Sequence, residues 1–365
     1  MNETITKAIA VAVQADVPVH IVGAPGTAKT SIGYAIVHGL GWPLEVVIAS
    51  IRDTTDFGGL PRLTDEGVQF LAPRWAAAHV NDDAPYCIIF DEISTAPPAV
   101  QAGCLRVIME KWVGDTYIPM ARFMAISNPP EQAAGGWDLT APMANRFCHL
   151  DWTIDPDVWI QGMVSGWDVE SCIPHLGREW ESLNLASNKV LISSFIRTKR
   201  HLLLQVPKDE SKAGGPWPSP RSWSMAARLK AAAESAECSK DVALLLISGC
   251  VGSGPAVEML AYLDNLDLPD TEEILARPAL FSPDGMRDDQ LFTIVNSVVS
   301  ATIQKMTEAR WLTCWEIMGK VASSKGSADI AAGSVGALLK HRGKDFQMNP
   351  KFMKPFIPLI EQLKK

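Results

Sequence analysis

Residues 23–30 combine glycines, a lysine and a threonine at a spacing that can hold phosphate. The run Gly-Ala-Pro-Gly-Thr-Ala-Lys-Thr follows the apolar segment 17–22 and precedes a helical pattern. Backbone N–H groups of a glycine-rich turn bind phosphate oxygens, and the positive end of the next helix adds to the attraction. In such a loop Lys29 reaches the β- and γ-phosphates of ATP, and Thr30 is a ligand of Mg²⁺. A Gly/Pro turn without a ligand is the alternative interpretation.

One position of this loop departs from the strict phosphate-binding pattern. Ala28 stands where a glycine usually precedes the lysine, and a left-handed backbone there would be strained. Alanine is small enough to keep a close approach of the backbone to phosphate. The expected nucleotide-binding residues of the loop are Gly23, Ala24, Pro25, Gly26, Thr27, Ala28, Lys29, Thr30 and Ser31.

A pair of acids follows the apolar run 86–90. Ligands of parallel α/β sheets bind at the carboxyl ends of strands, where Asp91 and Glu92 are expected to lie. Asp91 would bind Mg²⁺, and Glu92 would polarise the attacking water as the catalytic base. The alternative is that Asp91 or Ser94 only caps the following helix.

The elements that must position these residues alternate along the first 153 residues. Apolar runs predict strands near 18–22, 45–49, 86–90, 122–127 and 148–152. Helical patterns lie between them, near 4–14, 29–39, 73–79, 97–110 and 139–145. Strands that alternate with helices predict an α/β fold with a parallel sheet. Beyond Asp155-Pro156 the patterns are helical, including 188–205, 221–236, 239–251, 255–266, 288–307, 308–323 and 327–340.

These motifs together resemble the AAA+ ATPases, and among them the MoxR-like, dynein-related group. Alanine before the lysine is familiar in that group's phosphate loop. The segment Asp91-Glu92-Ile-Ser-Thr-Ala-Pro-Pro-Ala-Val-Gln-Ala resembles its second acidic motif. The segments 55–73 and 111–123 resemble two hairpins inserted in these proteins. The resemblance implies a P-loop NTPase core over 1–153, a helical lid over 154–266 and an additional C-terminal helical region over 267–365.

The resemblance also implies roles for three further residues. Asn128 matches the first sensor, which helps to place the water, and Arg221 matches the second sensor on the lid. Arg146 matches the arginine finger, which reaches the ATP of a neighbouring subunit. A guanidinium stabilises the charge that spreads over a transferring phosphoryl group. Asn128 before two prolines could instead be a turn residue, and either arginine could be a surface residue. Arg106 or Lys111 are alternative sources of the charge supplied in trans.

Composition limits the remaining possibilities. The net charge of −8 argues against dominant binding to nucleic-acid phosphates. The seven cysteines show no pattern of a zinc site or a disulfide framework. The apolar stretches are too short to insert into a membrane, and we expect a cytoplasmic protein.

Two classes of function remain open at this point. The first is a chaperone-like ATPase that forms a ring, most simply a hexamer, and remodels a protein client. The resemblance implies a partner with a von Willebrand A-type domain for this class. The second is a nucleic-acid motor or a restriction or defence component, and the acidic composition argues against it. A scaffold that binds ATP but hydrolyses it poorly is a weaker third, because Lys29, Asp91, Glu92 and Asn128 are all present.

Overall fold

The computed structural model describes residues 2–80, 82–132, 137–177, 179–325, 329–343, 346 and 350–357. The chain forms two compact units, of which the first comprises residues 1–180 and 202–257. The second comprises residues 181–201 and 258–365. The three-domain division expected from the sequence, with boundaries after residues 153 and 266, stays a prediction.

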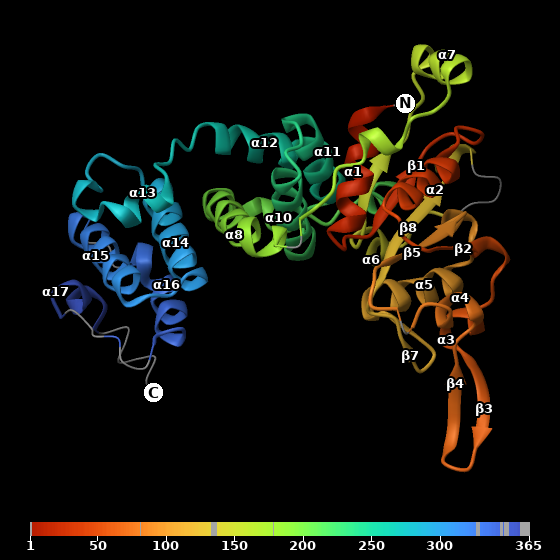
Figure 1. Ribbon diagram of the computed structural model, residues 1–365, viewed down its shortest axis with the longest axis horizontal. Coiled ribbons are helices and arrows are strands. Elements are labelled where there is room, and N and C mark those ends of the chain that lie inside the picture. The colour runs from red at the N-terminus through yellow and green to blue at the C-terminus, as the bar shows by residue number, and fades with distance from the viewer. Residues whose placement is uncertain are drawn as a thin grey trace. The chain divides into compact units, whose positions relative to one another are not determined.

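A five-stranded parallel sheet is the framework of the first unit (Figure 1). Its strands lie in the order β2-β5-β8-β1-β9. Because all five run in the same direction, their carboxyl ends meet at one edge. The predicted α/β parallel-sheet fold is confirmed. The strand bounds are β1 (Val19–Val22), β2 (Leu44–Ile48), β5 (Tyr86–Asp91), β8 (Ala121–Ser127) and β9 (Cys148–Asp151).

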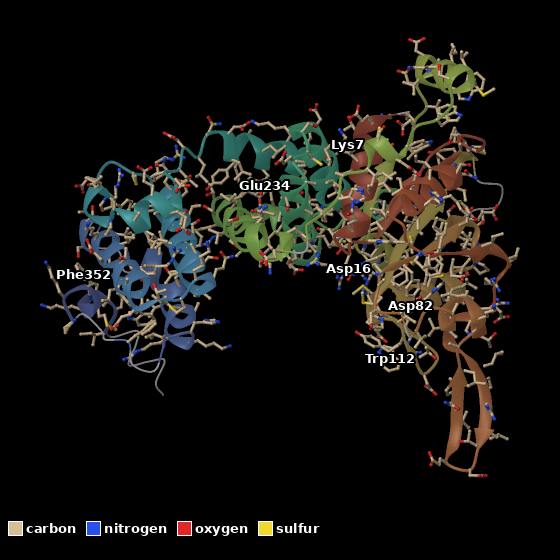
Figure 2. All side chains as sticks on the ribbon, in the orientation of Figure 1. Lys7, Asp16, Asp82, Trp112, Glu234 and Phe352 are labelled. Atoms are coloured by element: carbon tan, nitrogen blue, oxygen red, sulfur yellow. The ribbon has the colours of Figure 1, made fainter. Side chains whose placement is uncertain are left out.

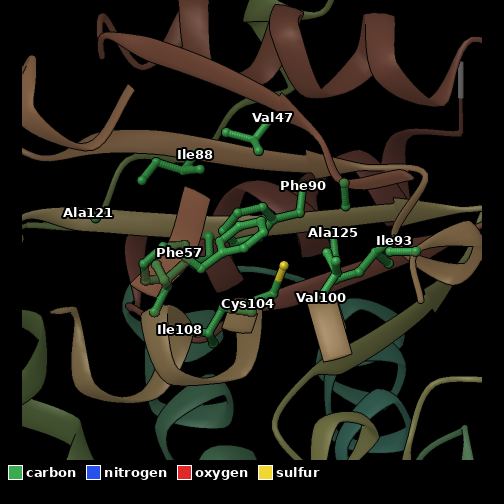
Figure 3. Close-up of a cluster of buried hydrophobic side chains, with 14 of the residues drawn as sticks. Val47, Phe57, Ile88, Phe90, Ile93, Val100, Cys104, Ile108, Ala121 and Ala125 are labelled. Atoms are coloured by element: carbon green, nitrogen blue, oxygen red, sulfur yellow. The ribbon is translucent and has the colours of Figure 1, made fainter. Parts of the chain in front are cut away.

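The central strands are buried on both faces, which explains their unbroken apolar sequences. Every residue of β5 from Tyr86 to Phe90 is buried. On one face of the sheet Phe90 packs with Phe57 and with Cys104 and Ile108 of the following helix (Figure 3). This core holds the strand end that carries the acidic pair, so the site rests on a rigid layer.

Helices connect the strands, and two of them are shorter than the sequence patterns predicted. The helices expected at 73–79 and 139–145 are single turns, and α7 lies beyond Asp155-Pro156, where helical patterns were expected but no bounds were given for this helix. The helices of the first unit are α1 (Glu3–Gln14), α2 (Lys29–Gly39), α3 (Thr55–Gly58), α4 (Arg74–Ala77), α5 (Pro98–Glu110), α6 (Ala141–Ala144), α7 (Pro156–Ser165), α9 (Glu210–Ala213), α10 (Pro220–Ser235) and α11 (Lys240–Val251).

Two hairpins project from this unit, at the places expected from the sequence. The longer pairs β3 (Leu60–Thr64) with β4 (Gly67–Leu71), and the shorter pairs β6 (Trp112–Val113) with β7 (Thr116–Tyr117) (Figure 1). Reciprocal hydrogen bonds join them: Phe70 N donates to Asp115 Oδ2 at 2.7 Å, and Asp115 N donates to Phe70 O at 2.9 Å. Gly114 allows this contact, because a Cβ there would lie 2.4 Å from Phe70 O. The hairpins therefore share a rigid base.

The remaining helices confirm the helical C-terminal part of the prediction. Trp311 and Trp315 are fully buried at the centre of its apolar core. The helix expected at 188–205 begins earlier, at Trp180, and the first two residues of the helix expected at 327–340 lie outside the described residues. The bounds are α8 (Trp180–Thr198), α12 (Ser253–Asp264), α13 (Thr271–Ala276), α14 (Asp288–Gln304), α15 (Glu308–Lys325), α16 (Asp329–Lys340) and α17 (Pro350–Met353). Within the described ranges, no helix is both long enough and apolar enough to cross a membrane.

Candidate functional site

The lysine of the phosphate loop is held at the base of the loop. Helix α2 begins at Lys29, whose side chain is buried and donates from Nζ to Gly23 O at 2.7 Å and Ala24 O at 2.8 Å. The same Nζ donates to Asn128 Oδ1 at 2.9 Å. Burial lowers the pKa of Lys29, and the charge of Asp91 opposes that shift. The structure thus brings the lysine, the predicted sensor and the end of β8 into direct contact.

The backbone at Ala28 has the left-handed conformation that the sequence marked as strained, with φ 60° and ψ 28°. This residue immediately precedes α2, so the left-handed turn lies at the junction between the loop and the first turn of the helix. A side chain in this region costs about 1–2 kcal/mol relative to the right-handed one. The strain lies where the loop must turn, as it often does at binding sites.

Trp152, the residue after β9, forms a hydrogen bond with the phosphate loop. Its indole Nε1 donates to Thr27 O at 2.8 Å. Gly23 lies so close to this strand that a Cβ there would be 2.5 Å from Trp152 O. The sequence did not identify Trp152 as a site residue, because its contact with the loop depends on the pairing of β1 with β9.

Two oxygen ligands stand together at the start of α2 and the end of β5. Thr30 Oγ1 donates to Asp91 Oδ2 at 3.0 Å. Magnesium in nucleotide sites takes one or two protein oxygens and completes its shell with phosphates and water. The pair fits that requirement, and no cluster of three metal-binding side chains is present in the described residues. Bound Mg²⁺ would neutralise phosphate charge, and Thr30 and Asp91 would hold it there.

Glu92 accepts a hydrogen bond from a serine in the 3-10 turn that follows the neighbouring strand β2. Ser50 Oγ donates to Glu92 Oε2 at 2.5 Å, and Glu92 itself has a left-handed φ of 56°. Glu92 N donates to Asp91 Oδ1 at 2.9 Å. The alternative that Asp91 or Ser94 caps the next helix is wrong, because α5 begins only at Pro98. The acids instead form a turn that directs the carboxylate of Glu92 toward the loop that follows β2.

We expect Ser50→Ala to lower the turnover of ATP about tenfold, because the substitution removes a hydrogen bond to a charged carboxylate. ATP binding should stay close to normal, since Ser50 does not belong to the phosphate loop. Steady-state ATPase assays and equilibrium titration with ATP measure the two effects separately. Ser50→Thr keeps the hydroxyl and is the matched control. Equal turnover of Ser50→Ala and wild type would show that this contact does not orient Glu92.

These groups surround one open pocket of about 700 Å³. Its lining includes Ser50 and the predicted residues Lys29, Thr30, Asp91, Glu92 and Asn128. A second pocket of about 530 Å³ shares the loop residues 26–28 and Ser31 with the first. Its walls are mostly apolar and include three indoles, Trp152, Trp159 and Trp167. The cavity that holds the charged side chains and the mostly apolar cavity therefore adjoin the same loop.

The two predicted arginines lie outside the larger pocket. Arg221 is the second residue of α10 and is exposed, while Arg146 donates from Nη1 to Pro142 O. The Nε of Arg146 is buried without a hydrogen-bond partner. Burial lowers the pKa of Arg146, and the positive charge of Arg221 adds to the effect. The two guanidinium groups are thus close enough to repel each other.

The two alternative cations have acidic partners within the first unit. Lys111 Nζ lies 2.7 Å from Asp16 Oδ2, with the lysine side chain only 18% exposed (Asp16 is labelled in Figure 2). Burial lowers the pKa of Lys111, and Asp16 opposes that shift. Arg106 Nε is paired with Glu110 Oε2 at 3.2 Å on the same helix. Among the four cations, the geometry favours Arg146 and Arg221 for contact with an added anion.

A buried pair of histidines lies within the sheet and contacts Ser127, the residue before Asn128. His20 on β1 and His149 on β9 are cross-strand neighbours, with their Nδ1 atoms 3.1 Å apart. His20 Nε2 lies 2.7 Å from Ser127 Oγ, and His149 Nε2 lies 2.8 Å from Ala144 O. Burial, and then the neighbouring His149, lowers the pKa of His20 well below its usual value. Burial lowers the pKa of His149 to about 4, although its hydrogen bond to Ala144 opposes the shift.

The histidine pair should make the sheet less stable as the pH falls from 6.5 toward 4. The two imidazoles bind protons in this pH range in the unfolded chain, but they stay neutral in the folded sheet. The free energy of unfolding therefore falls as the pH falls. The depressed pKa of His149 alone corresponds to about 3 kcal/mol, fully retained above pH 6.5. Amide hydrogen exchange at Val19–Val22, corrected for intrinsic rates, measures the effect. His149→Gln should reduce the slope between pH 6.5 and 5 by about half, because His20 still excludes its proton, and an unchanged slope would contradict the assignment.

Comparisons with known proteins agree with the general fold and go no further. No protein-family model and no curated protein matches the sequence. A provisionally described ATPase from Cytophaga hutchinsonii is 16% identical over 72% of this chain and 83% of its own, with a TM-score of 0.41. A full-length MCM homologue from Methanopyrus kandleri is 13% identical over 72% of this chain and 53% of its own, with a TM-score of 0.37. Similarities this low assign no activity to the chain.

Proposed function

We propose that this chain is an ATPase of the MoxR-like AAA+ type that works as a ring and remodels a protein client. One observation carries the proposal: a single pocket gathers a loop lysine, a threonine–aspartate pair and a glutamate held by a serine. These are the groups that ATP hydrolysis needs. Lys29 binds the β- and γ-phosphates, Thr30 and Asp91 hold Mg²⁺, and Glu92 accepts the proton of the attacking water.

The second pocket supports a nucleotide rather than inorganic phosphate as the ligand. It begins at loop residues 26–28, beside the phosphate site, and its walls are formed mainly by apolar side chains. A nucleobase is flat and apolar on its faces, and it stacks well on tryptophan. Trp159 and Trp167 are both about half exposed and offer such faces. We assign the adenine to this pocket and the phosphates to the larger one.

The arrangement of the arginines supports assembly into a ring, most simply a hexamer. Arg146 does not line the pocket of its own subunit, and it keeps an unpaired Nε. An arginine supplied by a neighbour would complete the charge stabilisation that the pocket lacks. A head-to-tail interface that repeats by rotation closes into a ring. A client protein and a partner with a von Willebrand A-type domain follow from the MoxR-like assignment.

ATPase measurements with Mg²⁺ test the proposal directly. Turnover should require both Mg²⁺ and Lys29, and ADP and phosphate should be released in equal amounts. Single-stranded and double-stranded DNA and RNA should each leave the rate unchanged. Strong stimulation by one of these nucleic acids would contradict the protein client and would favour a nucleic-acid substrate. Failure to bind ATP in an equilibrium titration would overturn the whole assignment.

A further inference from the structure

The hydrogen bonds around the two buried histidines allow only one arrangement of protons. The carbonyl of Ala144 can only accept, so His149 Nε2 must carry a hydrogen. A neutral imidazole has one N–H, so His149 Nδ1 must accept from His20 Nδ1. His20 Nε2 then accepts from the hydroxyl of Ser127. The bonds therefore run in one direction, from Ser127 through His20 and His149 to Ala144.

The hydrogen bonds that start at Ser127 end at Ala144 O, and the peptide bond from Ala144 to Asn145 joins them to a second set of hydrogen bonds at the start of α10. Asn145 is the next residue, and its Oδ1 accepts from Ser219 Oγ at 2.7 Å. Asn145 Nδ2 donates to Trp217 O at 3.2 Å. Ser219 caps α10 by accepting from Ser222 N at 3.1 Å. Asn145 and Ser219 are both buried, so these bonds are shielded from water.

Each end and turn of this chain adjoins a residue assigned to ATP hydrolysis. Ser127 immediately precedes Asn128, which binds the loop lysine. Asn145 immediately precedes Arg146, and Ser219 lies two positions before Arg221. Asn128 directly follows β8, Arg146 lies in the turn after α6, and Arg221 lies in the first turn of α10, so the sequence separates the three residues widely. One buried polar chain contacts all three segments.

We propose that the histidine relay, defined as Ser127, His20, His149, Ala144, Asn145 and Ser219, is a positioning element that holds Asn128, Arg146 and Arg221 in one fixed arrangement. The proposal rests on the ATPase function proposed above. Apolar side chains of similar size could fill the same volume, but apolar packing does not fix the orientation of the neighbouring segments. Buried hydrogen bonds do fix the positions of their partners, because movement of any partner leaves a buried polar group without a hydrogen bond. The relay acts through its neighbours and touches no substrate.

The first test compares His149→Leu with the conservative His149→Gln. Leucine fills the space and breaks two bonds of the relay, so turnover should fall about tenfold to hundredfold through misplacement of the arginines and Asn128. The affinity for ATP should change less than about threefold, because the phosphate loop keeps its contacts. Glutamine can still donate to Ala144 O and should recover part of the turnover. Unchanged turnover in folded His149→Leu would overturn the proposal.

A double-mutant cycle separates positioning from general damage. In an Arg146→Ala background, His149→Leu should cost several-fold less turnover than it costs in wild type, because one of the groups it positions is already gone. Independent damage to the fold would multiply the two losses, and that outcome would contradict the relay. Loss of ATP binding in wild type would instead contradict the proposed function, so the two failures are distinguishable.

A measurement on the wild-type protein covers the case in which His149→Leu does not fold. Imidazole ¹⁵N shifts by NMR should show His149 with its hydrogen on Nε2 and His20 with its hydrogen on Nδ1. Both rings should stay neutral from pH 8 to 5.5. The opposite tautomer of His20, or titration of either ring near pH 6.5, would break the directed chain and overturn the proposal.

Discussion

Glu92→Gln should bind ATP with near-normal affinity and hydrolyse it about two to four decades more slowly. Glutamine keeps the size of the side chain and can still accept from Ser50, but it lacks the carboxylate that takes the proton from water. The phosphate loop is untouched, so binding should persist. Single-turnover hydrolysis and equilibrium titration with ATP measure the two quantities independently.

Lys29→Ala is the contrasting variant for this experiment. It removes the charge that holds the β- and γ-phosphates, so ATP binding itself should weaken. The combination of bound but unhydrolysed ATP in Glu92→Gln with weak binding in Lys29→Ala would separate the two roles. A Glu92→Gln protein that turns over ATP at the wild-type rate would show that another group activates the water.

Arg146→Ala should retain ATP binding and lose about three decades or more of turnover, the range measured when an arginine finger is absent. The reason is that Arg146 lies outside the pocket of its own subunit and would complete a neighbour's site. Specific activity should therefore rise with protein concentration as rings assemble. ATPase assays over a dilution series, combined with light scattering, measure both effects.

Mixing inactive subunits gives the sharpest test of action in trans. Arg146→Ala subunits have an intact loop, and Lys29→Ala subunits have an intact arginine. Some interfaces of a mixed ring combine both, so activity should partly return. Arg106→Ala is a matched control, because Arg106 is exposed and paired with Glu110, and it should change turnover little. A fully active monomer at every dilution would leave Arg146 without a role.

The sheet and the main chemical groups could be predicted because their signals are local. A parallel strand buried on both faces is a short apolar run, and the residue at its end is visible in the sequence, as Asp91 is after 86–90. The phosphate loop is also a contiguous motif. The strained backbone at Ala28 followed from the side chain that replaces glycine, and the structure has that conformation.

The remaining groups could not be predicted because their contacts depend on which strands become neighbours. Ser50 meets Glu92 because β2 pairs with β5 in a register that places Ile48 opposite Asp91. His20 meets His149 only because β1 lies beside β9. Nothing in the local sequence around a single histidine indicates a partner 129 positions away.

The shared base of the two hairpins has a mechanical consequence. The shorter hairpin follows closely on the strand end that carries Glu92: a short turn leads to α5, α5 ends at Glu110, and β6 starts at Trp112 after the capping residue Lys111. The bonds between Phe70 and Asp115 then clamp β4 to this assembly. A five-residue strand is about 17 Å long, so we expect a rotation of α5 to displace the tip of β3–β4 more than the base of the hairpin near Gly114. In the same way, we expect a force on the tip to act through this base on the strand end that carries Glu92.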